Sequence, residues 1–139
     1  MDRKDRIGMK AEQQRLFEAL RCIRKSIQWK SGKDVVHLKK RQRMNHIPLS
    51  ATLLDYETII IDLVNDPFSI LYLYEFGEAT FYGIRGFVKE REWLVIFGEG
   101  GIMETAFPPE DMDDYLGKRG FTLIGTIKDV LEWTLNPKS

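Results

Sequence analysis

The sequence is poor in cysteine and has no long apolar run. Its one cysteine, Cys22, cannot form an internal disulfide, which is typical of a protein from a reducing compartment. No apolar stretch approaches the roughly 20 residues that a membrane-spanning helix requires. The first ten residues are charged and no apolar segment follows them, unlike a secretory signal. We therefore expect a cytoplasmic protein with no membrane partner.

Patterns that bind metals or cofactors are also missing. Two histidines and one cysteine are too few for a zinc site. The acids of residues 110–114 lack the glycine-broken spacing of a calcium loop, and the first turn of a helix explains them better. The glycines of residues 98–101 are not followed by Lys-Ser or Lys-Thr, so they indicate a hairpin and not a phosphate loop. We expect neither a metal nor a cofactor.

The length of 139 residues is enough for one hydrophobic core, so we predict a single domain over residues 1–139. Residues 1–9 are expected to be a disordered leader. The net charge of zero hides a strong asymmetry, because residues 1–48 carry 14 Lys and Arg against 5 Asp and Glu, whereas residues 49–139 carry 7 against 16. Either the two parts pair with each other, or the basic part forms a local surface for a polyanion. Nothing in the sequence indicates the oligomeric state.

The first half of the chain predicts helices. Residues 10–29 contain no Gly or Pro and place apolar residues three and four apart, which predicts a helix that ends at Ser31-Gly32. The β-branched residues of 34–38 predict a short strand. A second helix is expected over residues 51–65, with Ser50 as its N-cap.

The second half predicts strands at 69–76, 79–88, 92–97 and 102–107, followed by short helices at 110–117 and 124–135. The glycines between the third and fourth of these strands predict that 92–97 and 102–107 pair as a hairpin. The predicted fold class is α+β, with N-terminal helices packed on one face of a four- or five-stranded antiparallel sheet.

Both histidines, His37 and His46, lie in one basic segment, residues 35–46. Cleavage of a phosphodiester needs a group that titrates near neutrality and cations that stabilise charge on the phosphate oxygens, and this segment supplies both. A solvated basic loop with two incidental histidines is the alternative interpretation. Its cationic residues are Lys39, Lys40, Arg41 and Arg43.

Several short motifs over residues 34–108 occur in a characteristic order. A strand ending in a histidine with lysines close behind (Val36-His37-Leu38-Lys39-Lys40) comes first, then His46 before a helix, then Asp66-Pro67. The apolar strand Trp93-Leu94-Val95-Ile96 and the strand Ile102-Met103-Glu104-Thr105-Ala106-Phe107 follow. This order resembles that of the barnase–EndoU–colicin–RelE group of small ribonuclease toxins, especially its phage-associated branches.

The resemblance implies a barnase/RelE-like fold and a metal-independent endoribonuclease that uses the 2′-hydroxyl of RNA as its nucleophile. It implies that His37 is an acid/base, that His46 is a second catalytic candidate, and that Thr105 bonds the scissile phosphate. His37 and Thr105 are then expected to approach each other across adjacent strands. The partners it implies are RNA and a cognate inhibitor protein. The residues expected to hold the RNA are Lys39, Lys40, Arg41 and Arg43.

Two features leave the function open. Glu104 adjoins Thr105, and a carboxylate beside a phosphate site is unfavourable, although strand alternation is expected to turn it to the opposite face. The basic segment also suits a non-catalytic nucleic-acid-binding module, and the opposed charges suit a protein-interaction module. We expect Lys39, Lys40, Arg41 and Arg43 to be exposed and not paired with the acids of 110–114.

Overall fold

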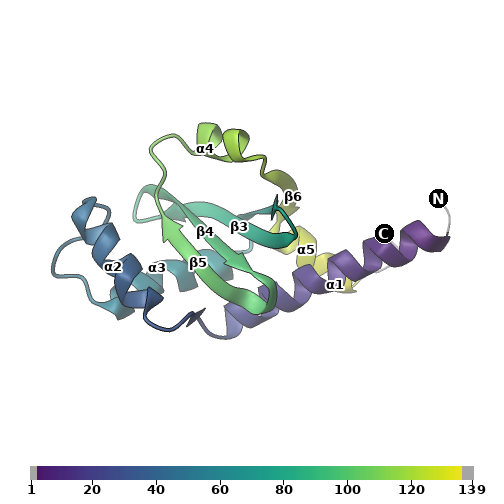
Figure 1. Ribbon diagram of the computed structural model, residues 1–139, viewed down its shortest axis with the longest axis horizontal. Helices are drawn as coiled ribbons and strands as arrows, with labels where there is room; N and C mark the ends of the chain where they lie inside the picture. The colour runs from purple at the N-terminus through teal and green to yellow at the C-terminus, as the bar shows by residue number, and fades with distance from the viewer. Residues whose placement is uncertain (1–2, 136–139) are drawn as a thin grey trace.

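Residues 3–135, which the computed structural model describes, build a six-stranded sheet with helices on both faces (Figure 1). The strand order is β1-β5-β4-β3-β2-β6. The strands are β1 (Gln28–Trp29), β2 (Ile70–Phe76), β3 (Ala79–Val88), β4 (Arg91–Gly98), β5 (Ile102–Phe107) and β6 (Thr122–Thr126). The helices are α1 (Arg3–Lys25), α2 (Lys33–Arg43), α3 (Leu53–Asn65), α4 (Met112–Arg119) and α5 (Ile127–Leu135). The predicted α+β class is confirmed.

The sheet is larger than predicted and is mixed. β2, β3, β4, β5 and β6 pair antiparallel with their neighbours, but β1 runs parallel to β5, with Gln28 opposite Ile102. β1 was not predicted, because Gln28 and Trp29 were assigned to the first helix, which in fact ends at Lys25. β6 was not predicted, because five residues that include Gly125 give a weak strand pattern and residues 124–126 were assigned to the closing helix.

The predicted strand over residues 34–38 is wrong, because these residues belong to α2. Two valines favour a strand locally, but residues 33–43 contain no Gly or Pro and are rich in Lys, Arg and Gln, which are good helix formers. Val35 and Val36 remain solvent-exposed on the helix. The N-cap of α3 is Thr52 and not Ser50, since Thr52 and Asp55 form a reciprocal capping box.

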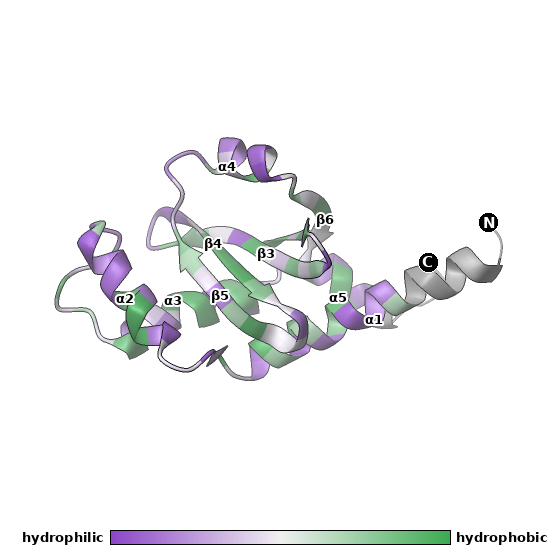
Figure 2. Ribbon diagram, in the orientation of Figure 1, coloured by the Kyte–Doolittle hydropathy of each residue, from purple (hydrophilic) through white to green (hydrophobic). Residues whose placement is uncertain are grey.

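The core lies mainly between one sheet face and helices α1, α3 and α5. Trp93, Val95 and Phe97 of β4 point into this core, whereas Leu94 and Ile96 point to the opposite face, which α4 covers. β4 is therefore buried on both sides, which explains its unbroken apolar sequence. Figure 2 shows this apolar centre against hydrophilic segments of α2 and α4. None of the helices within residues 3–135 is both long and apolar enough to cross a membrane.

The predicted hairpin of residues 92–97 and 102–107 is confirmed as β4 and β5. The turn between them, Glu99–Gly101, packs against α1, and both Gly100 and Gly101 have positive φ angles (71° and 79°). A Cβ at Gly101 would lie 2.8 Å from the Cβ of Cys22, whereas one at Gly100 would meet nothing within 4 Å. The contact of the hairpin with α1 therefore requires glycine at 101. The segment expected as a leader contributes the start of α1 from Arg3, and residues 1–2 lie outside the described range.

Replacing Gly101 by Ala should destabilise the protein more than replacing Gly100 by Ala. Both substitutions strain a left-handed backbone, at about 1 kcal/mol each, but only Gly101→Ala adds an overpacking cost of about 1–3 kcal/mol. Urea unfolding of the two variants measures the difference. Equal losses of stability would contradict the tight packing of the turn on α1.

Candidate active site

An open cleft of about 650 Å³ lies where α2 meets β5 and the C-terminal end of α4. β1 is the edge strand of the sheet on this side and pairs with β5. The chain leaves β1 at this edge and enters α2. Five of the lining side chains are cationic and one is a carboxylate. The cleft is lined by Lys30, Lys33, His37, Lys40, Arg41, Met44, Met103, Glu104, Thr105, Phe107, Tyr115 and Arg119.

His37 and Thr105 meet in this cleft. The His37 Nδ1 lies 3.3 Å from the Thr105 Oγ1, as the sequence analysis expected, but the contact joins a helix to a strand and not two adjacent strands. The imidazole also stacks on Trp29, with ring centroids 5.4 Å apart and planes 27° apart. Trp29 in turn donates a hydrogen bond from Nε1 to the Glu57 Oε2 at 3.0 Å. The stack and the hydrogen bond together fix the ring at the cleft wall.

Glu104 faces the same cleft, so the prediction that it turns to the opposite face is wrong. The register of β4 with β5 shifts here, since Ile96 pairs with Thr105 and Phe97 pairs with Met103. Glu104 is thus the extra residue of a β-bulge, which breaks the alternation of side chains along the strand. Its carboxylate accepts a 3.2 Å ion pair from Lys30. The bulge places a carboxylate and a hydroxyl side by side at the site.

The four cations predicted to bind RNA divide into two pairs. Lys40 and Arg41 line the cleft, whereas Lys39 and Arg43 are exposed and lie outside its lining. Arg41 is only 3% exposed, so the expectation that it is exposed is wrong. The four cations form no ion pair with the acids of 110–114 in the described part of the chain, where Asp113 pairs with Arg85 and Asp114 with Lys118.

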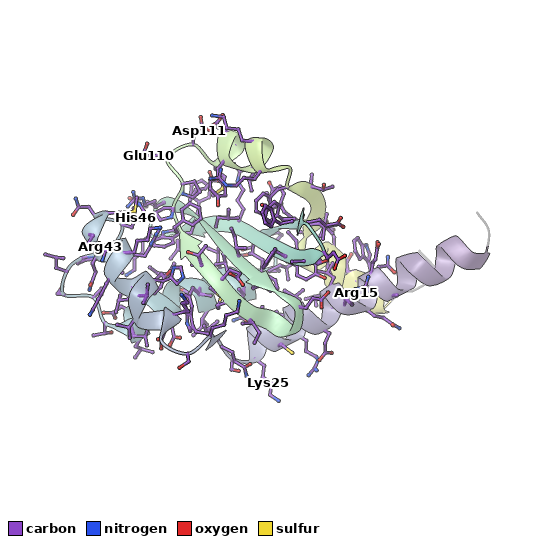
Figure 3. The ribbon with its side chains drawn as sticks, in the orientation of Figure 1. Arg15, Lys25, Arg43, His46, Glu110 and Asp111 are labelled. Carbon is purple, nitrogen blue, oxygen red and sulfur yellow. The ribbon has the colours of Figure 1, made fainter. Side chains whose placement is uncertain are left out.

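His46 lies against Arg41 and not against His37, because of how α2 ends. The backbone N–H of His46 bonds to the Arg41 carbonyl at 2.9 Å, and that of Asn45 to the Gln42 carbonyl at 3.1 Å. With Asn45 at φ 59°, this is a Schellman motif, which folds the chain back over the last turn. The His46 Nδ1 then lies 3.2 Å from the Arg41 Nη1. Figure 3 shows His46 and Arg43 together at this end of the molecule.

Two aromatic rings lie between two arginines along a wall of the cleft. The Arg41 guanidinium lies 5.4 Å from the centre of the Phe107 ring, and Phe107 meets Tyr115 edge-on at 5.0 Å. The Arg119 guanidinium lies 3.7 Å from the centre of the Tyr115 ring. An arginine that is stacked on a ring keeps its N–H groups at the edge of the guanidinium plane. This wall therefore combines π surfaces with donors for anions.

Burial and neighbouring cations keep both imidazoles neutral at pH 7. Burial lowers the pKa of His37 below its usual value, and the charges of Arg41, Lys40 and Lys33 lower it further, against a smaller opposing effect of Glu104. Burial, followed by the charges of Arg41 and Arg91, lowers the pKa of His46 to about 4. At neutral pH each ring can accept a proton or a hydrogen bond.

Eight lining residues were not predicted as site residues, and five of them are polar or charged: Lys30, Lys33, Glu104, Tyr115 and Arg119. Lys30 and Lys33 lie on either side of the predicted helix end at Ser31-Gly32, just before the basic segment, and their charge alone could have included them. Tyr115 and Arg119 are four residues apart, so the sequence predicts that they share one face of a helix. It does not predict that this face borders the cleft. Nothing in the sequence marks the bulge at Glu104.

Comparison of the chain with protein-family models, curated proteins and solved structures finds no match in any of the three. The chemistry of the cleft must then be inferred from its own residues. An imidazole held by a hydroxyl, surrounded by cations, suits the binding of an anionic ester and proton transfer to or from it.

Titration by NMR should show both imidazoles neutral at pH 7, with His46 gaining a proton only near pH 4. Because the pKa of His46 is lowered in the folded state, the stability that this group contributes is present above pH 6.5 and is lost as the pH falls toward 4. Arg91→Ala should raise the pKa of His46 by removing one of the neighbouring charges. A pKa near 6.5 for His46 in the folded protein would contradict the contact with Arg41.

Proposed function

We propose that the protein is a metal-independent endoribonuclease of toxin or phage-derived type, which cleaves RNA by transphosphorylation from the 2′-hydroxyl. The observation that carries the proposal is the contact of His37 with Thr105 at 3.3 Å in a cleft with five cationic side chains. Cleavage of RNA in this way needs proton transfer and stabilisation of phosphate charge, and the substrate itself supplies the nucleophile.

The cations around His37 would hold the scissile phosphate. Lys33, Lys40 and Arg41 lie close enough to the imidazole to lower its pKa, so an anion bound among them lies beside the ring. The same charges oppose the negative charge that develops on the phosphate oxygens as the 2′-oxygen attacks. The Thr105 hydroxyl is placed to bond the phosphate or to orient the imidazole.

His37 would act as the general base. Its lowered pKa makes the neutral imidazole the dominant form at pH 7, and this form accepts the proton of the 2′-hydroxyl. The bond from phosphorus to the 5′-oxygen then breaks, leaving a 2′,3′-cyclic phosphate. The ammonium group of Lys33 or Lys40 can protonate the departing oxygen, since both groups lie near His37.

The aromatic wall favours single-stranded RNA as the substrate. Unpaired bases stack on aromatic rings and on arginine planes, whereas the bases of a duplex are already stacked on one another. Phe107, Tyr115 and Arg119 offer such surfaces along the cleft. The wall therefore gives the enzyme contacts to a base as well as to phosphates.

The proposal includes a barnase/RelE-like architecture, for which the antiparallel meander from β2 to β5 next to N-terminal helices is the supporting feature. It also includes a cognate inhibitor protein, as is usual for toxins of the group that the sequence resembles. Because the cleft is cationic, the surface of such an inhibitor that covers it should be acidic.

His37→Ala should lower the rate of RNA cleavage about 10²–10⁴-fold, the usual loss for an acid/base group. The matched control is Lys39→Ala, which removes an exposed cation of the same helix that does not line the cleft, and its rate should change little. EDTA should leave the rate unchanged, because lysine and arginine side chains supply the positive charge. An oligonucleotide that lacks 2′-hydroxyls should bind without being cleaved.

Cleavage that is indifferent to His37→Ala would contradict the proposed mechanism. Binding of RNA that weakens with salt, with no cleavage by the wild-type protein, would instead identify a non-catalytic nucleic-acid-binding module. Absence of RNA binding at low salt would point to a protein-interaction module.

Glu104→Gln should keep the activity and move the acidic limb of the pH–rate profile to lower pH. The carboxylate raises the pKa of His37, so its removal makes the imidazole lose its proton at still lower pH. The pH dependence of kcat/KM measures this limb in the free enzyme. A loss of 10²-fold or more without such a shift would assign the role of base to Glu104 and not to His37.

A further inference from the structure

Arg41 is a buried cation that forms no ion pair with a carboxylate in the part of the chain that the structure describes. Its side chain lines the cleft, yet the residue is only 3% exposed. Burial lowers its pKa, and the opposing effect among the described residues comes from the hydroxyl of Tyr56 and not from a carboxylate. A buried charge without an opposite charge is strongly unfavourable, so proteins keep such groups mainly where they bind something.

The contacts of the guanidinium leave part of it unsatisfied. One face lies over the Phe107 ring at 5.4 Å, and the Nη1 lies 3.2 Å from the His46 Nδ1. The Nε has no hydrogen-bond partner among residues 3–135. A buried guanidinium whose hydrogen bonds are incomplete and which lines a cleft is suited to bind an anion that enters the cleft.

The contact with His46 fixes the state of that imidazole. An arginine side chain has donors only, so the Nδ1 must accept the hydrogen bond and the proton of the neutral ring must sit on Nε2. The Schellman motif at the end of α2 holds the two residues together through the backbone bond of His46 to the Arg41 carbonyl at 2.9 Å. An Nδ1 engaged in this way is not free to exchange protons with a substrate.

We propose that Arg41 is the main ligand for a phosphodiester anion in the cleft and that His46 is a positioning residue, which orients Arg41 as a neutral hydrogen-bond acceptor. Neutrality matters here, because a carboxylate in the same place would neutralise the guanidinium and compete with the anion. The choice of a phosphodiester rests on the proposed ribonuclease function, whereas the anion site itself follows from Arg41. His46 then acts through Arg41 and takes no part in proton transfer.

Substitutions of His46 by Asn and by Leu separate positioning from acid/base catalysis. The amide oxygen of Asn can accept the Arg41 N–H bond but cannot act as an acid or base near neutral pH, whereas Leu can do neither. We expect His46→Asn to retain the wild-type kcat/KM on single-stranded RNA within about threefold. His46→Leu should lower kcat/KM at least tenfold, and both variants should keep the wild-type pH profile.

Binding of an oligodeoxynucleotide measures the anion site without cleavage. His46→Leu and Arg41→Gln should each weaken this binding at least tenfold, His46→Asn should not, and circular dichroism should confirm that all three are folded. If the wild-type protein binds the probe in this pattern but cleaves no RNA, the anion site stands and the ribonuclease function fails. A 10²-fold loss of kcat in His46→Asn, with loss of one pH limb, would overturn the positioning role, as would unchanged binding in Arg41→Gln or His46→Leu.

Discussion

The β-bulge in β5 is the constraint on which the site depends. It inserts Glu104 between Met103 and Thr105, which pair with Phe97 and Ile96 of β4. On one side of the bulge Met103 enters the core, and on the other the buried Ala106 accepts a 2.6 Å hydrogen bond from the Tyr56 hydroxyl. The residues on both sides of the bulge are thus held in place, so the Glu104 carboxylate and the Thr105 hydroxyl face α2. His37 on α2 lies against the Thr105 hydroxyl.

The segregation of charge along the sequence has a structural counterpart in the cleft. Among the described residues, Asp113 of α4 pairs with Arg85 and Asp114 with Lys118, and the cations of α2 form no ion pair. Figure 3 shows Glu110 and Asp111 beside α4 and Arg43 on α2. The basic N-terminal part is therefore available for an anionic ligand although the protein has no net charge.

Strands with strong apolar patterns and a glycine turn, such as β4 and β5, could be predicted from the sequence, because their signal is local. The helix α2 could not be predicted, because the two valines of residues 34–38 favour a strand and the helix-forming lysines and arginines mostly follow them. The proximity of His37 and Thr105 was predicted through a resemblance, and the structure brings them together by a different route. Glu104 and Arg119 were missed because a register shift and the packing of α4 are tertiary effects.

We propose that the cleft cleaves RNA by attack of the 2′-oxygen on the neighbouring phosphorus. Phosphorus NMR of the products tests it directly, because this attack and no other leaves a 2′,3′-cyclic phosphate on one fragment and a 5′-hydroxyl on the other. We expect cyclic phosphate to appear at the rate of chain cleavage and His37→Ala to slow both together. Products that carry a 5′-phosphate, or intact RNA after prolonged incubation with the folded protein, would contradict it.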